Sequence, residues 1–275
     1  MTLPYWARVM WAETYKQVRL YWGQPGNLLL EALYPGFYFL SAYYMFRPFM
    51  DLSQPPPWLA AGKQGSLALF LLIGFLGFSI FQRLLFTGLG MVFGERQSGT
   101  LELQYLSPAS RFALLIGASI GGIVCSLYLY VAFLVGAAVF FGGWHLAHPA
   151  MLLVALLALF VPAVAWGALV SSFILFARDG GTIVQVVQPP LNFFGGMRFP
   201  VQLLPAPLPL VSALLPLAWS LSISRAVLLD AAPLADVAPS LAAAAALSAL
   251  SFAFAELNLR RSERAARDRG TFALY

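Results

Sequence analysis

Charge is what this sequence has least of. Only 10% of its 275 residues are Asp, Glu, Lys or Arg, whereas 60% are hydrophobic. Ordinary soluble domains carry about 25% charged residues, and a soluble chain of this size could not cover its surface with so few. The scarcity of charge therefore excludes a soluble globular protein and predicts an integral membrane protein.

Cysteine, lysine and histidine are also scarce. The single Cys125 excludes a disulfide framework or a cysteine metal cluster. Neither Lys16 nor Lys63 lies in the G-x-x-x-x-G-K-[S/T] frame that holds nucleotide phosphates. His145 and His148 have no third ligand near them in the sequence, so we expect no metal site. We expect this chain to bind no cofactor and to have no enzyme activity by itself.

The charges that are present border long apolar runs. Nothing between Arg111 and Arg178 is charged, and the stretch from Asp236 to Glu256 is also free of charge between its ends. One membrane helix needs about 20 apolar residues, whereas a membrane barrel would show alternating segments of about ten residues. We predict an all-α integral membrane fold with six transmembrane helices, at residues 27–46, 66–93, 111–141, 151–176, from 182 onward, and 237–254.

Three further segments complete the single transmembrane domain predicted for residues 1–275. Residues 4–22 mix Trp and Tyr with four charges, which favours an amphipathic helix lying in the membrane interface. Residues 198–235 are apolar but rich in proline, which predicts short re-entrant or surface helices on the outer side. Residues 255–275 form a basic tail that we expect to meet anionic lipid. The fifth span is expected to be interrupted by Pro189-Pro190 and by Gly195-Gly196.

Lys and Arg are distributed unequally between the two sides of this topology. Six spans place 11 of the 16 basic residues on the side of the two termini and 4 on the other side, with Arg83 inside a span. Loops that stay in the cytoplasm carry the excess of Lys and Arg. We therefore predict that both termini lie in the cytoplasm.

A polar segment at residues 94–110 separates the second and third predicted spans. Gly99 permits a sharp turn, and Thr100 is suited to cap a short helix that starts at Leu101. Glu102 would then favour the positive N-terminal end of that helix. On physical grounds alone, an ordinary solvated loop is an equally good interpretation.

This segment resembles a known family. The pattern Glu-Arg-x-x-Gly-Thr-Leu-Glu after the second span is similar to that of the membrane subunits of ABC-2-type (type V) ABC exporters. Six residues match it position by position: Glu95, Arg96, Gly99, Thr100, Leu101 and Glu102. The break-and-proline segment from Phe194 to Pro200 and the leucine and proline run through Leu217 also resemble the family, so the likeness covers nearly the whole chain.

The resemblance implies a permease subunit of a bacterial inner membrane, whose 94–110 segment is the cytoplasmic coupling helix. That helix would dock on a separate ABC ATPase, present in two copies, which binds ATP and Mg. A second permease copy or a related permease would complete the transporter. The exported substrate would be an amphipathic, drug-like or natural-product molecule or a lipid, taken from the cytoplasm or the inner leaflet.

Other functions remain as alternatives. An undecaprenyl-linked polysaccharide exporter is the first, because such exporters also use aromatic belts. A membrane-embedded enzyme is the second, although no Ser/His/Asp or His/Glu constellation is visible. Ion-coupled transport is disfavoured because the middle of every predicted span lacks a carboxylate. We expect no nucleic-acid partner, because the sequence shows no folded basic face with base-stacking groups.

Two groups of residues are candidates for the substrate pathway. Tyr38 and Tyr43 belong to an aromatic run at 36–46 that would either line a path or form packing and an interfacial belt. Arg83 lies in the inner half of a span, where it would either snorkel or face the pathway.

The second group lies on the fifth predicted span. Gln185, Gln188 and Asn192 have the spacing i, i+3, i+7 of one helix side, and Phe193 is adjacent. Amides within a span seek partners across helices, so these would bind a substrate or join two subunits.

Overall fold

The structure is a computed structural model that describes residues 4–23, 25–49, 67–97, 109–141, 150–174 and 180–269. For some residues within these helices, only the backbone is described. The described residues form helices, turns and bends, and no strand. The elements are α1 (Tyr5–Trp22), α2 (Pro25–Phe46), η1 (Arg47–Phe49), α4 (Leu67–Gln97), α6 (Arg111–Phe141), α7 (Ala150–Ile174), α8 (Gly180–Phe194), η2 (Val201–Leu203), α9 (Leu208–Ala213), α10 (Pro216–Leu228) and α11 (Leu234–Arg269).

Four of the described helices are long and apolar enough to cross a membrane. Their candidate spans are Leu67–Met91, Arg111–Phe133, Ala150–Ile174 and Leu234–Arg261, so the chain is a multi-pass helical membrane protein. The other two predicted spans correspond to α2, with 22 residues, and α8, with 15. Since α8 is shorter than the roughly 20 residues that a membrane crossing needs, a total of six spans stays a prediction.

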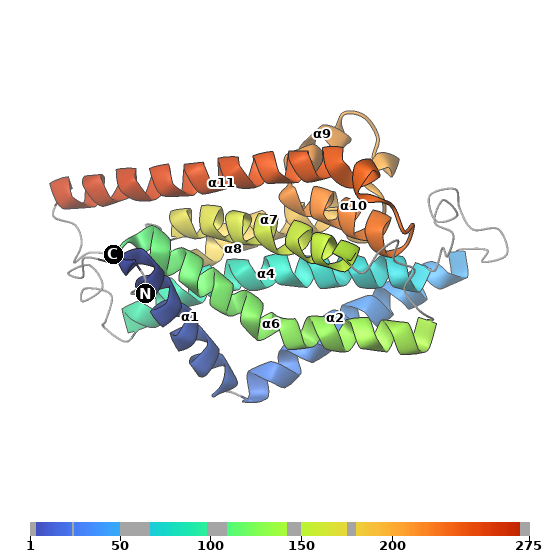
Figure 1. Ribbon diagram of the computed structural model, residues 1–275, viewed down its shortest axis with the longest axis horizontal. Helices are drawn as coiled ribbons and strands as arrows, with labels where there is room; N and C mark the ends of the chain where they lie inside the picture. Colours follow the sequence, from blue (N-terminus) through green and yellow to red (C-terminus); the bar gives the residue numbers. More distant parts are fainter. Residues whose placement is uncertain are drawn as a thin grey trace.

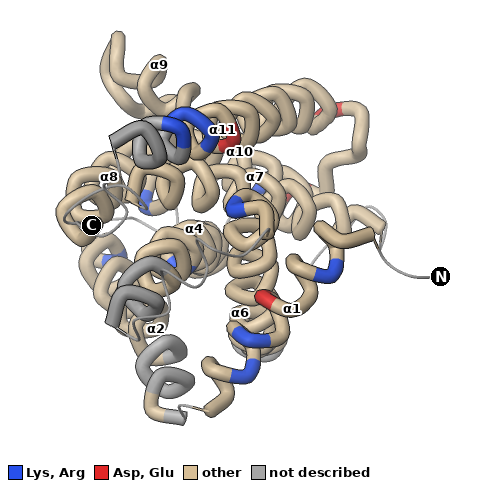
Figure 2. Tube along the Cα trace, turned by 90° about the vertical axis from the view of Figure 1, so that its left-hand side faces the viewer, with Lys and Arg blue, Asp and Glu red and all other residues tan. Residues whose placement is uncertain are grey.

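The long helices lie roughly along one axis and run alternately in opposite directions (Figure 1). At one end, on the left of Figure 1, α1 begins, α4 ends, α6 begins and α11 ends. Figure 2 looks at that end and shows Lys and Arg on α1 and on the last described turns of α11. The end of α4 and the start of α6, which flank the predicted coupling segment, therefore lie at the same end of the molecule as the last described turns of α11.

The centre of the bundle is α4. It packs against α2, α6, α7, α8 and α10, and every residue from Leu67 to Phe78 is buried. A helix that is apolar all around its circumference is stable only where neighbours surround it. These five helices are therefore arranged around α4, whereas α1 packs on α6 and α11 packs on α7 and α10.

Small residues bring the central helices close together. Gly88 of α4 faces Ser171 of α7, where an added Cβ would lie 1.7 Å from the Ser171 Oγ. One turn earlier, the same kind of contact joins Gly167 of α7 to Leu84 of α4. Membrane helices lack a hydrophobic driving force between them and associate largely through such close packing.

The prediction that Pro189-Pro190 interrupts the fifth span is wrong. Helix α8 continues through both prolines and ends at Phe194. Both prolines are exposed, as is Gln185, whose carbonyl lies one turn before Pro189, so the lost hydrogen bonds fall on the outside of the bundle. The break occurs at Gly195 and Gly196, and Gly196 has a φ of 74°, which glycine adopts without a steric penalty.

The proline-rich 198–235 segment forms short helices at the end of the bundle opposite the start of α1 (Figure 1). Prolines stand at the first turns of α9 and α10, where their missing N–H groups cost nothing. The turn from Leu229 to Pro233 then leads into α11, which has 36 residues. The position of these short helices within the membrane stays a prediction.

Candidate functional site

The predicted coupling segment is only partly within the described residues. Glu95 and Arg96 lie in the last turn of α4, and their side chains are outside the described part. Gly99, Thr100, Leu101 and Glu102 lie outside the described residues altogether. On the far side of the segment, the Ser110 Oγ accepts a hydrogen bond from the Ala113 N–H at 3.4 Å and so caps the start of α6.

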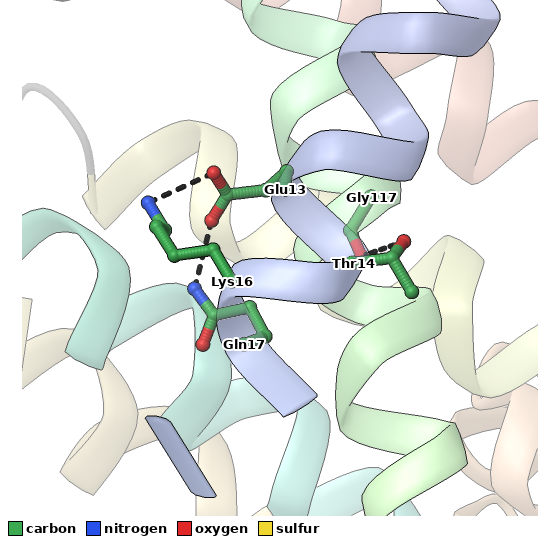
Figure 3. A network of polar contacts seen from close by, with 5 residues as sticks. All are labelled: Glu13, Thr14, Lys16, Gln17 and Gly117. Carbon is green, nitrogen blue, oxygen red and sulfur yellow. Dashed lines mark hydrogen bonds and ion pairs between the residues drawn. The ribbon is translucent and has the colours of Figure 1, made fainter. Parts of the chain in front are cut away.

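Helix α1 is docked on the first half of α6. The Thr14 hydroxyl donates a hydrogen bond of 2.9 Å to the carbonyl of Gly117 (Figure 3). A Cβ at Gly117 would lie 2.6 Å from the Met10 carbonyl oxygen, so glycine is what allows the two backbones to touch. A helix is confirmed at this place, as Tyr5–Trp22, and its buried side faces α6, while its position in the membrane interface stays a prediction.

A buried carboxylate lies at this contact. Glu13 is only 4% exposed, and its two oxygens accept from Lys16 and from the Gln17 amide, each at 2.8 Å (Figure 3). A buried carboxylate is tolerable only when it is paired and hydrogen-bonded. Five aromatic side chains of α1 instead point outward, because Tyr5, Trp6, Trp11, Tyr15 and Trp22 are exposed, whereas Tyr21 is buried.

The burial of Glu13 is not predicted from the sequence, because a charged side chain in an interfacial helix is expected to face water. The available signal was the spacing of Glu13, Lys16 and Gln17, since residues three and four apart share one helix face. Figure 3 shows that Glu13 is paired with Lys16 and Gln17 within α1, while Thr14 makes the hydrogen bond to α6.

We expect Gly117→Leu to detach α1 from α6. The leucine side chain has no room beneath the Met10 backbone, and overpacking of this kind costs about 1–3 kcal/mol. Hydrogen exchange of the α1 amides should accelerate by about tenfold or more. The matched control is Ala132→Leu at an exposed position of α6, and equal exchange in both variants would contradict the docking.

A cavity of about 410 Å³ lies between α2, α4 and α6. Its walls combine apolar and polar side chains and include one charge, that of Arg83. The lining residues are Tyr34, Pro35, Leu76, Ser79, Ile80, Gln82, Arg83, Phe86, Ser126, Leu129 and Tyr130. Such a mixed lining suits a molecule with an apolar body and a polar group.

Arg83 also borders a second hollow of about 330 Å³ between α1, α4 and α6. Its guanidinium carbon lies 4.3 Å from the centre of the Tyr21 ring, within the range of a cation–π contact. Phe86 lines both hollows. The half-buried Arg83 thus stands between the end of the docked helix α1 and the cavity.

The tyrosines predicted for the pathway lie beside this cavity on α2. Tyr38 accepts a hydrogen bond of 3.0 Å from Tyr34, and Tyr34 itself lines the cavity. Tyr43 lies further along α2, where its ring stacks on Phe39 with centroids 6.1 Å apart and an interplanar angle of 23°. The lining of the cavity includes neither Tyr38 nor Tyr43.

The candidates on α8 are separate from Arg83. Gln185 is exposed, and Gln188 and Asn192 are half-buried. Phe193 is 51% exposed and makes an edge contact with Phe199 at 5.6 Å between ring centroids. None of these four lines the cavity around Arg83. The side of α8 that carries Gln185 and Phe193 lies on the surface of the described part of the chain.

The family of the chain follows from comparison with known proteins. The model of the ABC-2 type transporter family matches residues 8–229, from the first turn of α1 to the residue after α10. The chain therefore belongs to this family and is an ABC transporter permease subunit, which confirms the resemblance found in the sequence. A comparison with curated proteins gave no match.

Proposed function

We propose that the chain is the permease of an ATP-driven exporter that moves an amphipathic, drug-like or natural-product molecule or a lipid outward across a bacterial inner membrane. The observation that carries the proposal is the cavity between α2, α4 and α6, where apolar side chains and polar groups surround the single charge of Arg83. An amphipathic molecule would match both kinds of wall.

The energy for export comes from a separate ATPase that docks at residues 94–110. This segment connects the central helix α4 to α6, and α6 holds α1 through Thr14 and Gly117. A push on the segment would therefore reach α4 and the α1–α6 pair together. Two ATPase copies and a second permease copy or a related permease complete the assembly, with ATP and Mg on the ATPase and both permease termini in the cytoplasm.

Purification of the permease from its native membrane tests this proposal. We expect an ABC ATPase to co-purify with it and to hydrolyse ATP faster when an amphipathic substrate is added. A permease that purifies without any ATPase would contradict the exporter assignment.

We expect Glu102→Lys to weaken ATPase docking by at least about tenfold while leaving membrane insertion intact, because it reverses a charge at the start of the predicted coupling helix. A pull-down of the ATPase with the variant permease measures the effect. Glu256→Lys is the matched control, since Glu256 lies on α11 and pairs with Arg260. Equal recovery of the ATPase by wild type and Glu102→Lys would argue against the role of this segment.

A further inference from the structure

The short helices after α8 enclose a cavity that the sequence did not indicate. It has a volume of about 590 Å³ and is bordered by the start of α4, the turn after α8, η2, α9 and α10. Phe70, Pro209 and Leu229 contribute apolar wall. Arg225 and Asp230 contribute two opposite charges. This cavity is separate from the one around Arg83, because the two share no lining residue.

Arg225 is fixed within the wall of this cavity. Its guanidinium donates hydrogen bonds to the carbonyls of Gly196 at 2.7 Å, Met197 at 2.9 Å and Phe70 at 3.2 Å. The guanidinium carbon also lies 3.5 Å from the centre of the Phe70 ring. Carbonyl dipoles and a ring face offset the charge of this half-buried cation only in part, and the Arg225 Nε has no hydrogen-bond partner within the described chain.

Asp230 lies on the same cavity without pairing with Arg225. No ion pair joins either residue to another described residue. Asp230 is an exposed residue that contributes to the cavity, and partial burial of its carboxyl raises the pKa. Ser212 adds a fully buried hydroxyl to the wall, and its Oγ has no hydrogen-bond partner within the described residues.

Two opposite charges that share a cavity and do not touch each other are complementary to a molecule that carries both signs. A purely anionic group near Arg225 would face the Asp230 carboxylate, and a purely cationic group near Asp230 would face Arg225. A zwitterion satisfies both, because each of its charges meets the opposite charge of the protein. A primary ammonium suits Asp230 better than a quaternary one, since only the primary ammonium donates hydrogen bonds.

We propose that this cavity binds the headgroup of a zwitterionic amphiphile, with an acidic phosphate at Arg225, a primary amine at Asp230 and the apolar chain along the Phe70, Pro209 and Leu229 wall. The molecule is either a membrane lipid or a transported amphiphile of the same chemistry. The site does not rest on the exporter assignment, because the permease alone carries every residue that forms it.

Binding of short-chain lipids to the full-length permease in detergent tests the site. The probes are dioctanoyl phosphatidylethanolamine, which carries the primary amine, dioctanoyl phosphatidylcholine, which carries a quaternary amine, and dioctanoyl phosphatidylglycerol, which carries none. We expect saturable binding of the ethanolamine lipid, about tenfold tighter than that of either other lipid. Native mass spectrometry or a thermal-shift titration measures these affinities. Equal affinity for all three lipids, or no saturable binding, would overturn the proposal.

Two variants separate the roles of charge and space. Asp230→Asn should lose about tenfold in affinity for the ethanolamine lipid and gain affinity for the glycerol lipid, because the repulsion of an anion is removed. Ser222→Trp, at an exposed position that lines the cavity, should abolish binding of all three while Arg225 keeps its hydrogen bonds. Both variants should retain the melting temperature of the wild type. An unchanged lipid preference in Asp230→Asn would overturn the assignment of the amine.

The source of the ligand is distinguished by a second measurement. A membrane lipid should remain bound to wild-type permease after purification and be absent from Ser222→Trp. A transported amphiphile should instead stimulate the ATPase of the assembled complex, and Ser222→Trp should abolish that stimulation.

Discussion

Gly74→Ala should destabilise the folded permease by about 1–3 kcal/mol, the usual cost of overpacking a filled interior. Gly74 lies on the central helix α4, and a Cβ there would come within 2.1 Å of the Met197 carbonyl oxygen and 2.7 Å of the Arg225 Nη2. The carbonyl cannot move freely, because Arg225 holds it by a hydrogen bond. One methyl group would therefore displace α4, the turn after α8 and α10 from one another.

Gly90→Ala is the matched control for this experiment. Gly90 lies on the same helix, and a Cβ there would meet nothing within 4 Å. Alanine also has the higher helix propensity, so the control should leave stability unchanged or raise it slightly. Unfolding by sodium dodecyl sulfate in mixed micelles measures both variants. Equal stability of the two would show that the packing at Gly74 is looser than the structure indicates.

Arg83→Gln should remove a preference of the transporter for acidic amphiphiles. The half-buried Arg83 provides the charge of the cavity between α2, α4 and α6, and a cation in an apolar wall attracts an anionic group more strongly than it would in water. We expect the concentration of a fatty acid that half-maximally stimulates the partner ATPase to rise about tenfold. The value for the methyl ester of the same fatty acid should stay unchanged.

Arg83→Lys is the control that separates charge from packing. Lysine keeps the positive charge but lacks the planar guanidinium that lies over the Tyr21 ring. If the charge selects the substrate, lysine should restore most of the preference for the acid over the ester. A loss of stimulation by both compounds in Arg83→Gln and Arg83→Lys alike would instead assign Arg83 to the attachment of α1.

The helical membrane class could be predicted from the sequence because it depends on long-range composition. The uncharged stretch between Arg111 and Arg178 exceeds one membrane thickness, and the structure places two apolar helices, α6 and α7, within it. The ends of these helices are set by local chemistry, such as the Ser110 cap of α6. The apolar length of a helix and the cap at its end both depend on residues that are close together in the sequence.

The two proline-containing breaks show where local chemistry misleads. Pro189-Pro190 has the same appearance in the sequence as the prolines that start α9 and α10, yet α8 passes through it. The difference is where the carbonyls without a hydrogen-bond partner lie, which depends on how α8 faces its neighbours. The sequence of α8 alone does not show which side of the helix will face the neighbouring helices.

Arg225 and Glu13 could not have been assigned for a related reason. The carbonyl partners of Arg225 include Phe70, 155 residues earlier in the chain, and backbone carbonyls are identical at every position. Glu13 is buried because α6 offers Gly117 opposite its turn, not because of a feature of α1. The candidate residues that the sequence suggested, such as Arg83 and the tyrosines of α2, were recognisable because their own side chains are unusual inside a span.

The length of α11 has a geometric consequence. With 36 residues at about 1.5 Å per residue, it measures about 54 Å, well beyond the roughly 30 Å of a bilayer core. Asn258 anchors it to α7 by donating to the Ser172 carbonyl at 3.1 Å, and the helix continues past that point to Arg269. Because the helix is continuous, the orientations of Arg260, Arg261 and Arg264 around the helix axis are fixed relative to the membrane span. A single inserted residue after Asn258 would rotate these three arginines by about 100° around the helix axis.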